Sequence, residues 1–127
     1  MTVLSEADKA LLDAPEYATV ATIDPDGQPQ LSVVWVGRDG DDVLFSTLKG
    51  RRKTRNLERD PRASVLIFPR EDPYHYLELR GTVSMVEDPT AAYIDEMALK
   101  YTGVARFDGP REGRIVVRLT PHHVVTH

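Results

Sequence analysis

Seven cationic side chains lie close together in one short segment of this sequence, and only two acidic residues oppose them. The cations are Lys49, Arg51, Arg52, Lys53, Arg55, Arg59 and Arg62, and the acidic residues are Glu58 and Asp60. The segment therefore carries +5, whereas the whole chain of 127 residues carries −4. The acidic remainder would repel a long polyanion such as nucleic acid. The pattern favours a small anion, such as a phosphate group, bound at one focused site.

The residues around this segment predict how its cations are positioned. Residues 42–47, DVLFST, are typical of a strand, and residues 50–60 have the composition of a helix. Cations in the first turn of a helix have the wrong sign for the helix dipole. A bound phosphate would remove that penalty, because the free amides, the dipole and the cations then all attract it. Ser46 and Thr47 would add hydroxyl donors. A solvated basic helix face is the alternative interpretation.

The rest of the sequence predicts an antiparallel β-protein with few helices. The turn sequences DPDG and RDGD separate the early strands by a few residues, which is typical of hairpins. A helix is expected at 88–103, with Asp88 as its cap, Pro89 at its first position and Gly103 at its end. About six strands with inserted helices favour an antiparallel barrel over a doubly wound parallel sheet. The expected strands are 17–23, 28–37, 42–47, 62–68, 74–87 and 114–121, with a short one at 122–127, and a short helix covers 5–13.

Length and composition limit the remaining possibilities. A chain of 127 residues is long enough for a sizeable core, so we expect one domain over 1–127. The absence of cysteine excludes disulfides and thiolate metal ligands. His122, His123 and His127 are not expected to bind a metal, because adjacent strand residues point to opposite faces. The first residues do not resemble a signal peptide and no segment is apolar enough to span a membrane, so we expect a cytoplasmic protein.

Three motifs resemble a known family. They are YATVATIDPDGQPQLSVVWV, LFSTLKGRRKTRNLERDPRASVLI and DPYHYLELRGTVSMVED, in this order. They look like the pyridoxamine 5′-phosphate oxidase-like split β-barrels, and most like the actinobacterial branch that uses the deazaflavin coenzyme F420 in place of FMN. The resemblance extends from about residue 17 to residue 121. It implies a six-stranded antiparallel split barrel with short flanking helices, paired into a homodimer with cofactor clefts at the dimer interface.

The resemblance also implies which residues bind the cofactor. The phosphate would lie against Arg51, Arg52 and Lys53, beside the strand end that carries Ser46 and Thr47. The ring would lie along the strand that contains Gln30 to Trp35, largely through backbone contacts, with the segment around His75 near its far side, from the same or the partner subunit. The expected cofactor-binding residues are Gln30, Ser32, Val34, Trp35, Ser46, Thr47, Arg51, Arg52, Lys53, His75 and Tyr76.

The function that this resemblance implies is an F420-dependent oxidoreductase that transfers a hydride between the deazaflavin and a small electron-poor organic substrate. The cofactor supplies the reactivity in such enzymes, so we assign no catalytic side chain. An FMN-dependent oxidoreductase of the same fold and a non-catalytic carrier of flavin, F420 or haem are the alternatives. We do not expect oxidation of pyridoxamine 5′-phosphate, because the C-terminal basic and aromatic motif of that enzyme is not found here. The substrate cannot be inferred from the sequence.

Overall fold

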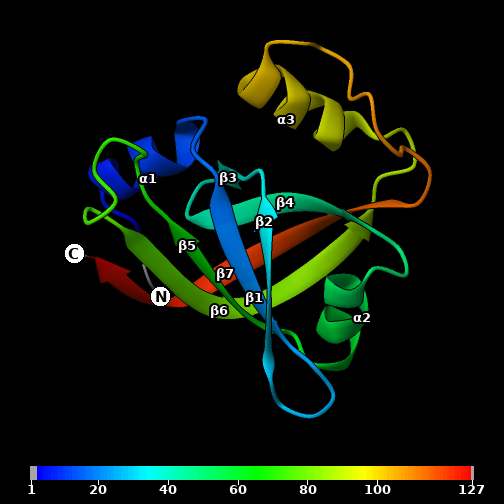
Figure 1. Cartoon of the computed structure of the whole chain (residues 1–127), viewed down its shortest axis with the longest axis horizontal. Coiled ribbons are helices and arrows are strands. Elements are labelled where there is room, and N and C mark those ends of the chain that lie inside the picture. Colours follow the sequence, from blue (N-terminus) through cyan, green and yellow to red (C-terminus); the bar gives the residue numbers. More distant parts are fainter. Residues whose placement is uncertain (1–2, 127) are drawn as a thin grey trace.

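One antiparallel sheet, with strands of different lengths, forms the centre of the molecule (Figure 1). The structure is a computed structural model and describes residues 3–126. Its seven strands pair in the order β2-β1-β5-β6-β7-β4-β3, so that β2 and β3 form the two ends of the sheet. The elements are α1 (Glu6–Asp13), β1 (Ala18–Ile23), β2 (Pro29–Val34), β3 (Gly37–Asp39), β4 (Asp42–Leu48), α2 (Arg52–Arg59), β5 (Arg62–Ile67), β6 (Leu77–Glu87), α3 (Ala92–Thr102) and β7 (Arg114–Thr126).

The strand expected at 28–37 is two strands rather than one. β2 pairs with β1, whereas β3 pairs with β4 at the other end of the sheet. The chain turns between them at Trp35 and Val36, where the amide of Val36 donates a hydrogen bond of 3.0 Å to the Tyr101 hydroxyl. The Tyr101 hydroxyl, from a helix far along the chain, thus accepts the backbone N–H hydrogen bond that would otherwise extend the strand pairing of β2. This break gives seven strands where six were expected.

The C-terminal half of the sheet is more continuous than expected. Residues 114–121 and 122–127 were expected as separate strands, but β7 runs unbroken through this region to the end of the described residues. It pairs along β6, and the register shifts between Arg80 and Gly81. A Cβ added at Gly81 would lie 2.0 Å from the Thr120 carbonyl oxygen, so the backbones approach too closely for a side chain. A β-bulge therefore lies at Gly81.

The helix bounds show which capping signals were correctly interpreted. α2 begins at Arg52 with Arg51 as its N-cap residue, and Asp60 ends it. α3 begins at Ala92 rather than after Asp88, so the expected start was wrong by about one turn. The Asp88 carboxylate still serves the helix end, because it accepts hydrogen bonds from the amides of Ala92 (3.3 Å) and Tyr93 (2.9 Å). Asp88 therefore caps α3 from a position further upstream than the usual N-cap.

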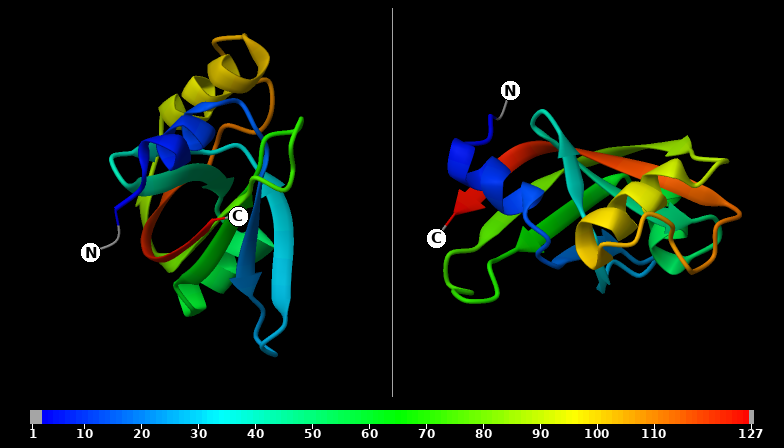
Figure 2. Two further views of the ribbon diagram at one scale, coloured as in Figure 1. Left: turned by 90° about the vertical axis from the view of Figure 1, so that its left-hand side faces the viewer. Right: turned by 90° about the horizontal axis from the view of Figure 1, so that it is seen from above.

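Two hydrophobic clusters hold the fold together. The larger one fills the concave side of the sheet and includes Leu12 of α1 and Leu57 of α2. The smaller one packs the buried face of α3, with its Tyr101, against Trp35 and Phe107. Figure 2 shows the curl of the sheet and α3 lying outside it. No helix in the described range 3–126 is long and apolar enough to cross a membrane.

Candidate functional site

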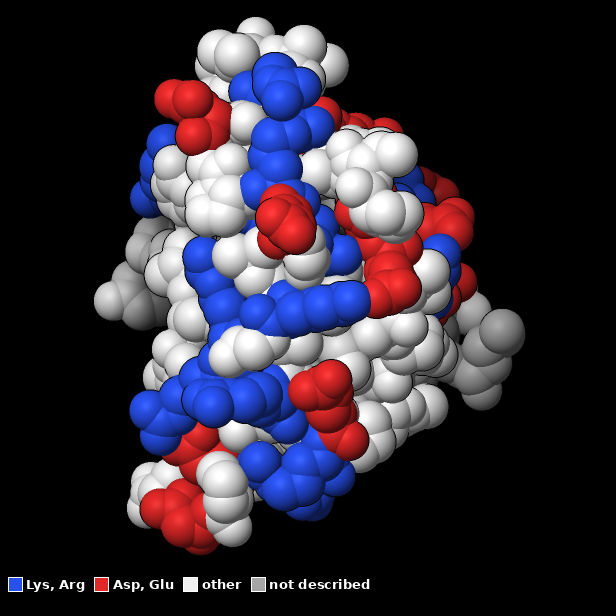
Figure 3. All heavy atoms as spheres, turned by 90° about the vertical axis from the view of Figure 1, so that its right-hand side faces the viewer, with Lys and Arg blue, Asp and Glu red and all other residues white. Residues whose placement is uncertain are grey.

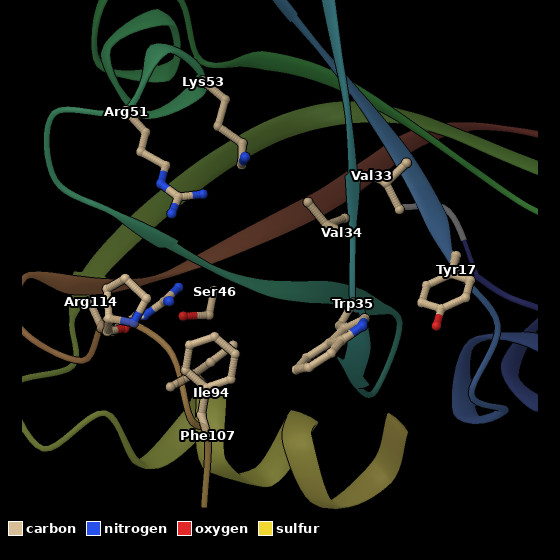
Figure 4. A pocket seen from close by; sticks show the side chains of 11 residues that line it. Tyr17, Val33, Val34, Trp35, Ser46, Arg51, Lys53, Ile94, Phe107 and Arg114 are labelled. Carbon is tan, nitrogen blue, oxygen red and sulfur yellow. Dashed lines mark hydrogen bonds between the residues drawn. The ribbon is translucent and has the colours of Figure 1, made fainter. Parts of the chain in front are cut away.

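A cavity of about 240 Å³ opens where the N-terminal end of α2, the end of β2 and the start of β7 approach α3. Its lining divides into a cationic side and an apolar side, which Figure 4 shows facing each other across the space. The lining residues are Tyr17, Val33, Val34, Trp35, Ser46, Arg51, Lys53, Ile94, Phe107, Pro110 and Arg114. Five of the residues expected to bind a cofactor are among them: Val34, Trp35, Ser46, Arg51 and Lys53.

The cationic side consists of Arg51, Lys53 and Arg114. Arg51 and Lys53 come from the first turn of α2, where no acidic residue balances them. No carboxylate of the described residues lies within the 4.0 Å limit for an ion pair with any of the three. Burial lowers the pKa of Lys53, and the neighbouring charges of Arg51 and Arg114 lower it further. The folded chain thus leaves three positive charges without a counterion at one wall of a cavity.

Ser46 lies beside these cations at the end of β4. Its Oγ atom is buried and has no hydrogen-bond partner. Figure 4 shows the hydroxyl between the guanidinium of Arg114 and the apolar wall. Buried polar atoms are nearly always hydrogen-bonded, so an exception in a cavity indicates a position where a ligand or water supplies the partner. A phosphoryl oxygen would accept a hydrogen bond from this hydroxyl.

The apolar side is formed by aromatic rings that support one another. Trp35 stacks on Tyr101 with ring centroids 5.3 Å apart and an interplanar angle of 11°. Phe107 meets Trp35 edge-on at 5.8 Å and 87°. Tyr101 is fixed in turn, because its hydroxyl donates to the Glu16 carbonyl at 2.7 Å. The result is a flat, rigid surface next to a cationic wall, which suits a ligand that is planar at one end and anionic at the other.

Arg52 and Thr47, both expected to contact the cofactor phosphate, do not line this cavity. The Arg52 Nε donates to Asp24 Oδ1 at 2.9 Å, so its guanidinium joins α2 to the turn after β1. Thr47 is buried, and its hydroxyl lies 3.0 Å from that of Thr54. Both residues hold α2 in place and thereby fix the direction of its first turn. Arg52 and Lys53 are adjacent in the helix and point in directions about 100° apart, which is why only Lys53 of the two reaches the cavity.

The remaining expected residues lie elsewhere. Gln30 accepts a hydrogen bond from Thr22 at 3.2 Å on the inner side of β2, and Ser32 has a buried Oγ without a partner. His75 is exposed and pairs with Asp72 in the loop before β6. Tyr76 is partly buried at the end of the same loop. None of the four lines the cavity of this chain.

Several residues that complete the cavity were not predicted from the sequence. Arg114 and Phe107 come from the loop and strand that follow α3, and Tyr17 and Ile94 complete the apolar side. Arg114 belongs to the sequence RIVVRL, whose alternation of polar and apolar residues predicts a strand with exposed arginines. It is instead 5% exposed. The only available signal was the aromatic and glycine content of the preceding loop, which does not specify a contact.

His122 and His123 do not line this cavity. His122 Nε2 is 3.0 Å from the Thr82 hydroxyl, and His123 lies opposite Arg80 in the β6–β7 ladder. His127 lies outside the described residues. Within residues 3–126, no three histidine, aspartate or glutamate side chains gather in a way that could hold a metal ion.

The charged surface extends beyond the cavity. Figure 3 shows Lys and Arg side chains forming a band over the face of the molecule that carries α2, with several acidic side chains beside and among them. A field of this kind attracts anions to the mouth of a cavity before they make contact. The acidic residues that balance the chain are concentrated elsewhere in the sequence.

Comparison with known proteins assigns the family. Residues 4–127 match the family described as pyridoxamine 5′-phosphate oxidase. The chain belongs to this family. The resemblance inferred from the three sequence motifs is therefore confirmed, and the fold is that of the family's oxidoreductases.

Curated members of the pyridoxamine 5′-phosphate oxidase family are similar to part of the chain. A pyridoxine/pyridoxamine 5′-phosphate oxidase of Rhodopseudomonas palustris is 34% identical over 89 residues, which is 69% of this chain and 42% of that protein. One from Aeromonas hydrophila is 38% identical over 76 residues, 59% of this chain and 34% of that protein. The chain thus spans less than half the length of these relatives.

Solved structures match over nearly the whole chain. One described as an F420 reductase superposes with a TM-score of 0.87 and 30% identity, covering 96% of this chain and 98% of that one. A conserved hypothetical protein from Mycobacterium tuberculosis superposes with a TM-score of 0.77 and 28% identity, covering 96% of this chain and 83% of that one. The family's split-barrel architecture is thereby established for this chain, with a sheet of seven strands that does not close.

Proposed function

We propose that this chain is an F420-dependent oxidoreductase that binds the phosphorylated tail of the deazaflavin at the cationic wall of the cavity. The observation that carries the proposal is the convergence of Arg51, Lys53 and Arg114, without a counterion, beside a flat aromatic surface. The similarity to a structure described as an F420 reductase over nearly the full length of both chains supports the choice of cofactor.

The phosphate end of the ligand fits the donors on the cationic wall. Arg51 and Lys53 supply charge at the end of α2, whose first amides point out of the helix. The Ser46 hydroxyl supplies a neutral donor. A phosphodiester offers acceptors to all of these groups at once, and hydrogen bonds between charged partners are about twice as strong as neutral ones. Binding of a phosphate also gives each unpaired cation the partner that the fold does not provide.

The ring end of the ligand fits the apolar side. Val34 and Trp35 present apolar surface at the end of β2, next to Phe107. β2 is an end strand of the sheet, so one of its edges has no pairing strand and keeps free backbone donors and acceptors. Such groups can read the polar edge of a tricyclic ring while the side chains cover its faces. This arrangement supports the proposal that the ring binds along Gln30 to Trp35 through the backbone.

The chemistry that a reduced deazaflavin supplies when bound is hydride donation to an electron-poor carbon or nitrogen atom. The chain's own residues bind the cofactor, orient its ring and shield it from water. The cations of the first turn of α2 fix the tail, and the Trp35–Phe107 contact fixes the plane in which a ring can lie. The side chains of Trp35, Ile94 and Phe107 exclude water from one face of that plane. No side chain of the cavity is assigned as a proton donor.

We propose further that the working unit is a homodimer in the cytoplasm. Leu31 and Val33 are 63% and 68% exposed on the outer face of β2, and Tyr74 is 76% exposed in the loop before β6. Exposed apolar side chains of this kind are typical of an interface. A second copy packed there could bring its His75 and Tyr76 to the open side of the cavity, which would account for their absence from the lining within one chain. Light scattering of the purified protein tests the dimer.

The decisive experiment for the cofactor is direct binding. We expect the purified protein to quench or shift F420 fluorescence with low-micromolar affinity or better, and to bind FMN more weakly. Replacing Arg51 and Lys53 together by Ala should weaken binding by about a hundredfold, because two charge-assisted contacts are lost. Arg55→Ala is the matched control, since Arg55 is an exposed cation of α2 that does not line the cavity. Equal affinity of the double variant and the wild type would remove the site assignment.

An FMN-dependent activity is the second candidate, and the names of the curated relatives favour it. FMN ends in a phosphate that the same three cations could hold. Tight binding of FMN without binding of F420 would select this candidate. Oxidation of pyridoxamine 5′-phosphate by the FMN-loaded protein, followed as pyridoxal 5′-phosphate absorbance, would extend the relatives' named activity to this chain. Cofactor binding without turnover of any electron-poor acceptor would instead favour a carrier.

A further inference from the structure

Arg114 has surroundings unlike those of the two arginines nearest to it in the sequence. Arg111 Nη2 lies 2.8 Å from Asp95 Oδ2, and Arg118 donates to Asp42 at 2.9 Å and to Asp39 at 2.8 Å. Arg114 is more deeply buried than either, at 5% exposed. It nevertheless has no carboxylate within 4.0 Å among the described residues. A buried guanidinium is almost always paired, so the lack of a partner calls for a functional explanation.

The contacts of Arg114 fix the guanidinium and leave one of its edges free. Its Nε donates to the Pro110 carbonyl at 2.8 Å. Its Cζ lies 4.9 Å from the centroid of the Phe107 ring, which covers one face of the group. Neither Nη atom has a hydrogen-bond partner among residues 3–126. Figure 4 shows the side chain directed toward Ser46, inside the cavity. Two parallel N–H donors on a fixed plane match two oxygens of a phosphoryl group.

The electrostatic surroundings of Arg114 point the same way. Burial lowers the pKa of its guanidinium, and the positive charges of Arg51 and Arg111 lower it further, while no acidic residue acts against them. Arg114 in turn lowers the pKa of Lys53. The charges on this wall therefore repel one another in the ligand-free chain. A substitution that removes the unpaired charge of Arg114 would relieve this repulsion between cations. Binding of an anion would also relieve it, and the charge of Arg114 would be kept.

We infer that Arg114 is an anion-binding residue whose charge the fold leaves uncompensated, so that a phosphoryl group in the cavity both contacts its free edge and stabilises the folded chain. The inference deepens the proposed function, since it concerns the same cavity. It needs only a phosphoryl group on the ligand and does not depend on the ring. It also assigns a role to the loop before β7, because Pro110 and Phe107 of that loop set the orientation of the guanidinium.

The test uses inorganic pyrophosphate as the probe and thermal unfolding as the readout. Millimolar pyrophosphate should raise the unfolding midpoint of the wild-type protein by about 3 °C or more. Arg114→Met keeps an unbranched apolar stem and removes the charge and the N–H donors. We expect its midpoint without ligand to be close to the wild-type value or above it, and its response to pyrophosphate to be less than a third of the wild-type response. A full response of Arg114→Met would overturn the inference, and so would the absence of any response in the wild type.

Two further variants keep the test decisive. Arg118→Met is the matched control on the same strand, since it breaks the pairs with Asp39 and Asp42 and should lower the ligand-free midpoint while leaving the pyrophosphate response intact. Arg114→Lys keeps the charge but lacks the paired donors, so its response should fall to about half. If Arg114→Met does not fold, Arg114→Lys decides the matter: a wild-type response in that variant would contradict binding through the guanidinium edge.

A comparison of ligands separates this inference from the proposed function. FMN and riboflavin share a ring, but only FMN carries a phosphate. Arg114→Met should weaken the binding of FMN and F420 by at least about tenfold and leave any binding of riboflavin unchanged. An equal loss for FMN and riboflavin would show that Arg114 acts on the ring, against the inference. A wild-type protein that responds to pyrophosphate but binds neither F420 nor FMN would refute the proposed function alone.

Discussion

Arg52 pairs with Asp24 across the space between α2 and the turn that follows β1, and Asn56 from the next turn of α2 donates to the same carboxylate at 2.9 Å. Asp24 is 7% exposed, so α2 is joined to the sheet by a nearly buried carboxylate with two partners. The neighbouring Arg51 has no such partner and lines the cavity. Two adjacent arginines therefore do different work, one holding the helix in place and the other facing the ligand site.

This division predicts opposite phenotypes for two alanine variants. Arg52→Ala leaves the Asp24 carboxylate with only Asn56 as a side-chain partner and should lower the unfolding midpoint by several degrees, with little change in ligand affinity once the protein is folded. Arg51→Ala should leave the midpoint near the wild-type value and weaken binding of F420 or FMN by about tenfold. Differential scanning fluorimetry and fluorescence titration on the same samples measure both effects. Loss of affinity in Arg52→Ala alone would reverse the assignment.

The same carboxylate predicts a pH dependence of stability. The hydrogen bond from Arg52, followed by that from Asn56, lowers the pKa of Asp24 below its ordinary value. A lowered pKa in the folded state stabilises the protein above the unfolded-state pKa of about 3.9, and this stabilisation is lost as the pH falls through the folded-state pKa. Asp24→Asn should therefore unfold at a lower temperature than the wild type at pH 7. The difference between the two should shrink below pH 4. A constant difference from pH 7 to pH 3 would exclude this linkage.

The sequence predicted the local features of the site because they depend on neighbours in the chain. The strand that carries Ser46, the helix that follows it and the two cations at the start of that helix all lie within residues 42–60. Charge and periodicity over such a window were enough to propose an anion site there. The family resemblance then supplied the ring-binding strand, and Val34 and Trp35 do line the cavity. His75 and Tyr76 stay predictions, because one chain alone does not place them at the cavity.

The parts that sequence reasoning missed depend on contacts between distant segments. The strand expected at 28–37 breaks because the Tyr101 hydroxyl, far along the chain, binds the Val36 amide. Arg114 is buried because Pro110 and Phe107 fold over it, and nothing in the alternation of RIVVRL reports this. In both cases a hydrogen bond or ring contact made in the folded chain overrides the structure that the local sequence pattern predicts.

Gly81 provides a test of the bulge that bends β6 against β7. A Cβ at this position would lie 2.0 Å from the Thr120 oxygen and 2.8 Å from its carbonyl carbon, both of them backbone atoms that cannot move aside separately. Gly81→Ala should destabilise the fold by about 2 to 3 kcal/mol, measured as a lower urea midpoint with an unchanged slope. Ser84→Ala, an exposed change on the same strand, should have almost no effect. A wild-type midpoint for Gly81→Ala would mean that the two strands can separate at the bulge at little cost.

Asp95 of α3 holds the loop that carries Phe107, and this connection predicts an effect on ligand binding from a residue outside the cavity lining. The carboxylate accepts a hydrogen bond of 2.8 Å from the Phe107 amide and pairs with both Nη atoms of Arg111. These contacts lower the pKa of Asp95, so the loop should stay attached at pH values where ordinary aspartates are protonated. Asp95→Asn should speed hydrogen exchange and proteolysis within residues 103–113, since the loop loses its attachment to α3. It should also weaken binding of F420 or FMN by about threefold to tenfold, since Phe107 and Arg114 lose their fixed positions.

Glu96→Gln, an exposed neighbour on the same helix, should change neither measurement. Faster proteolysis without any loss of affinity would show that the loop forms no part of the site.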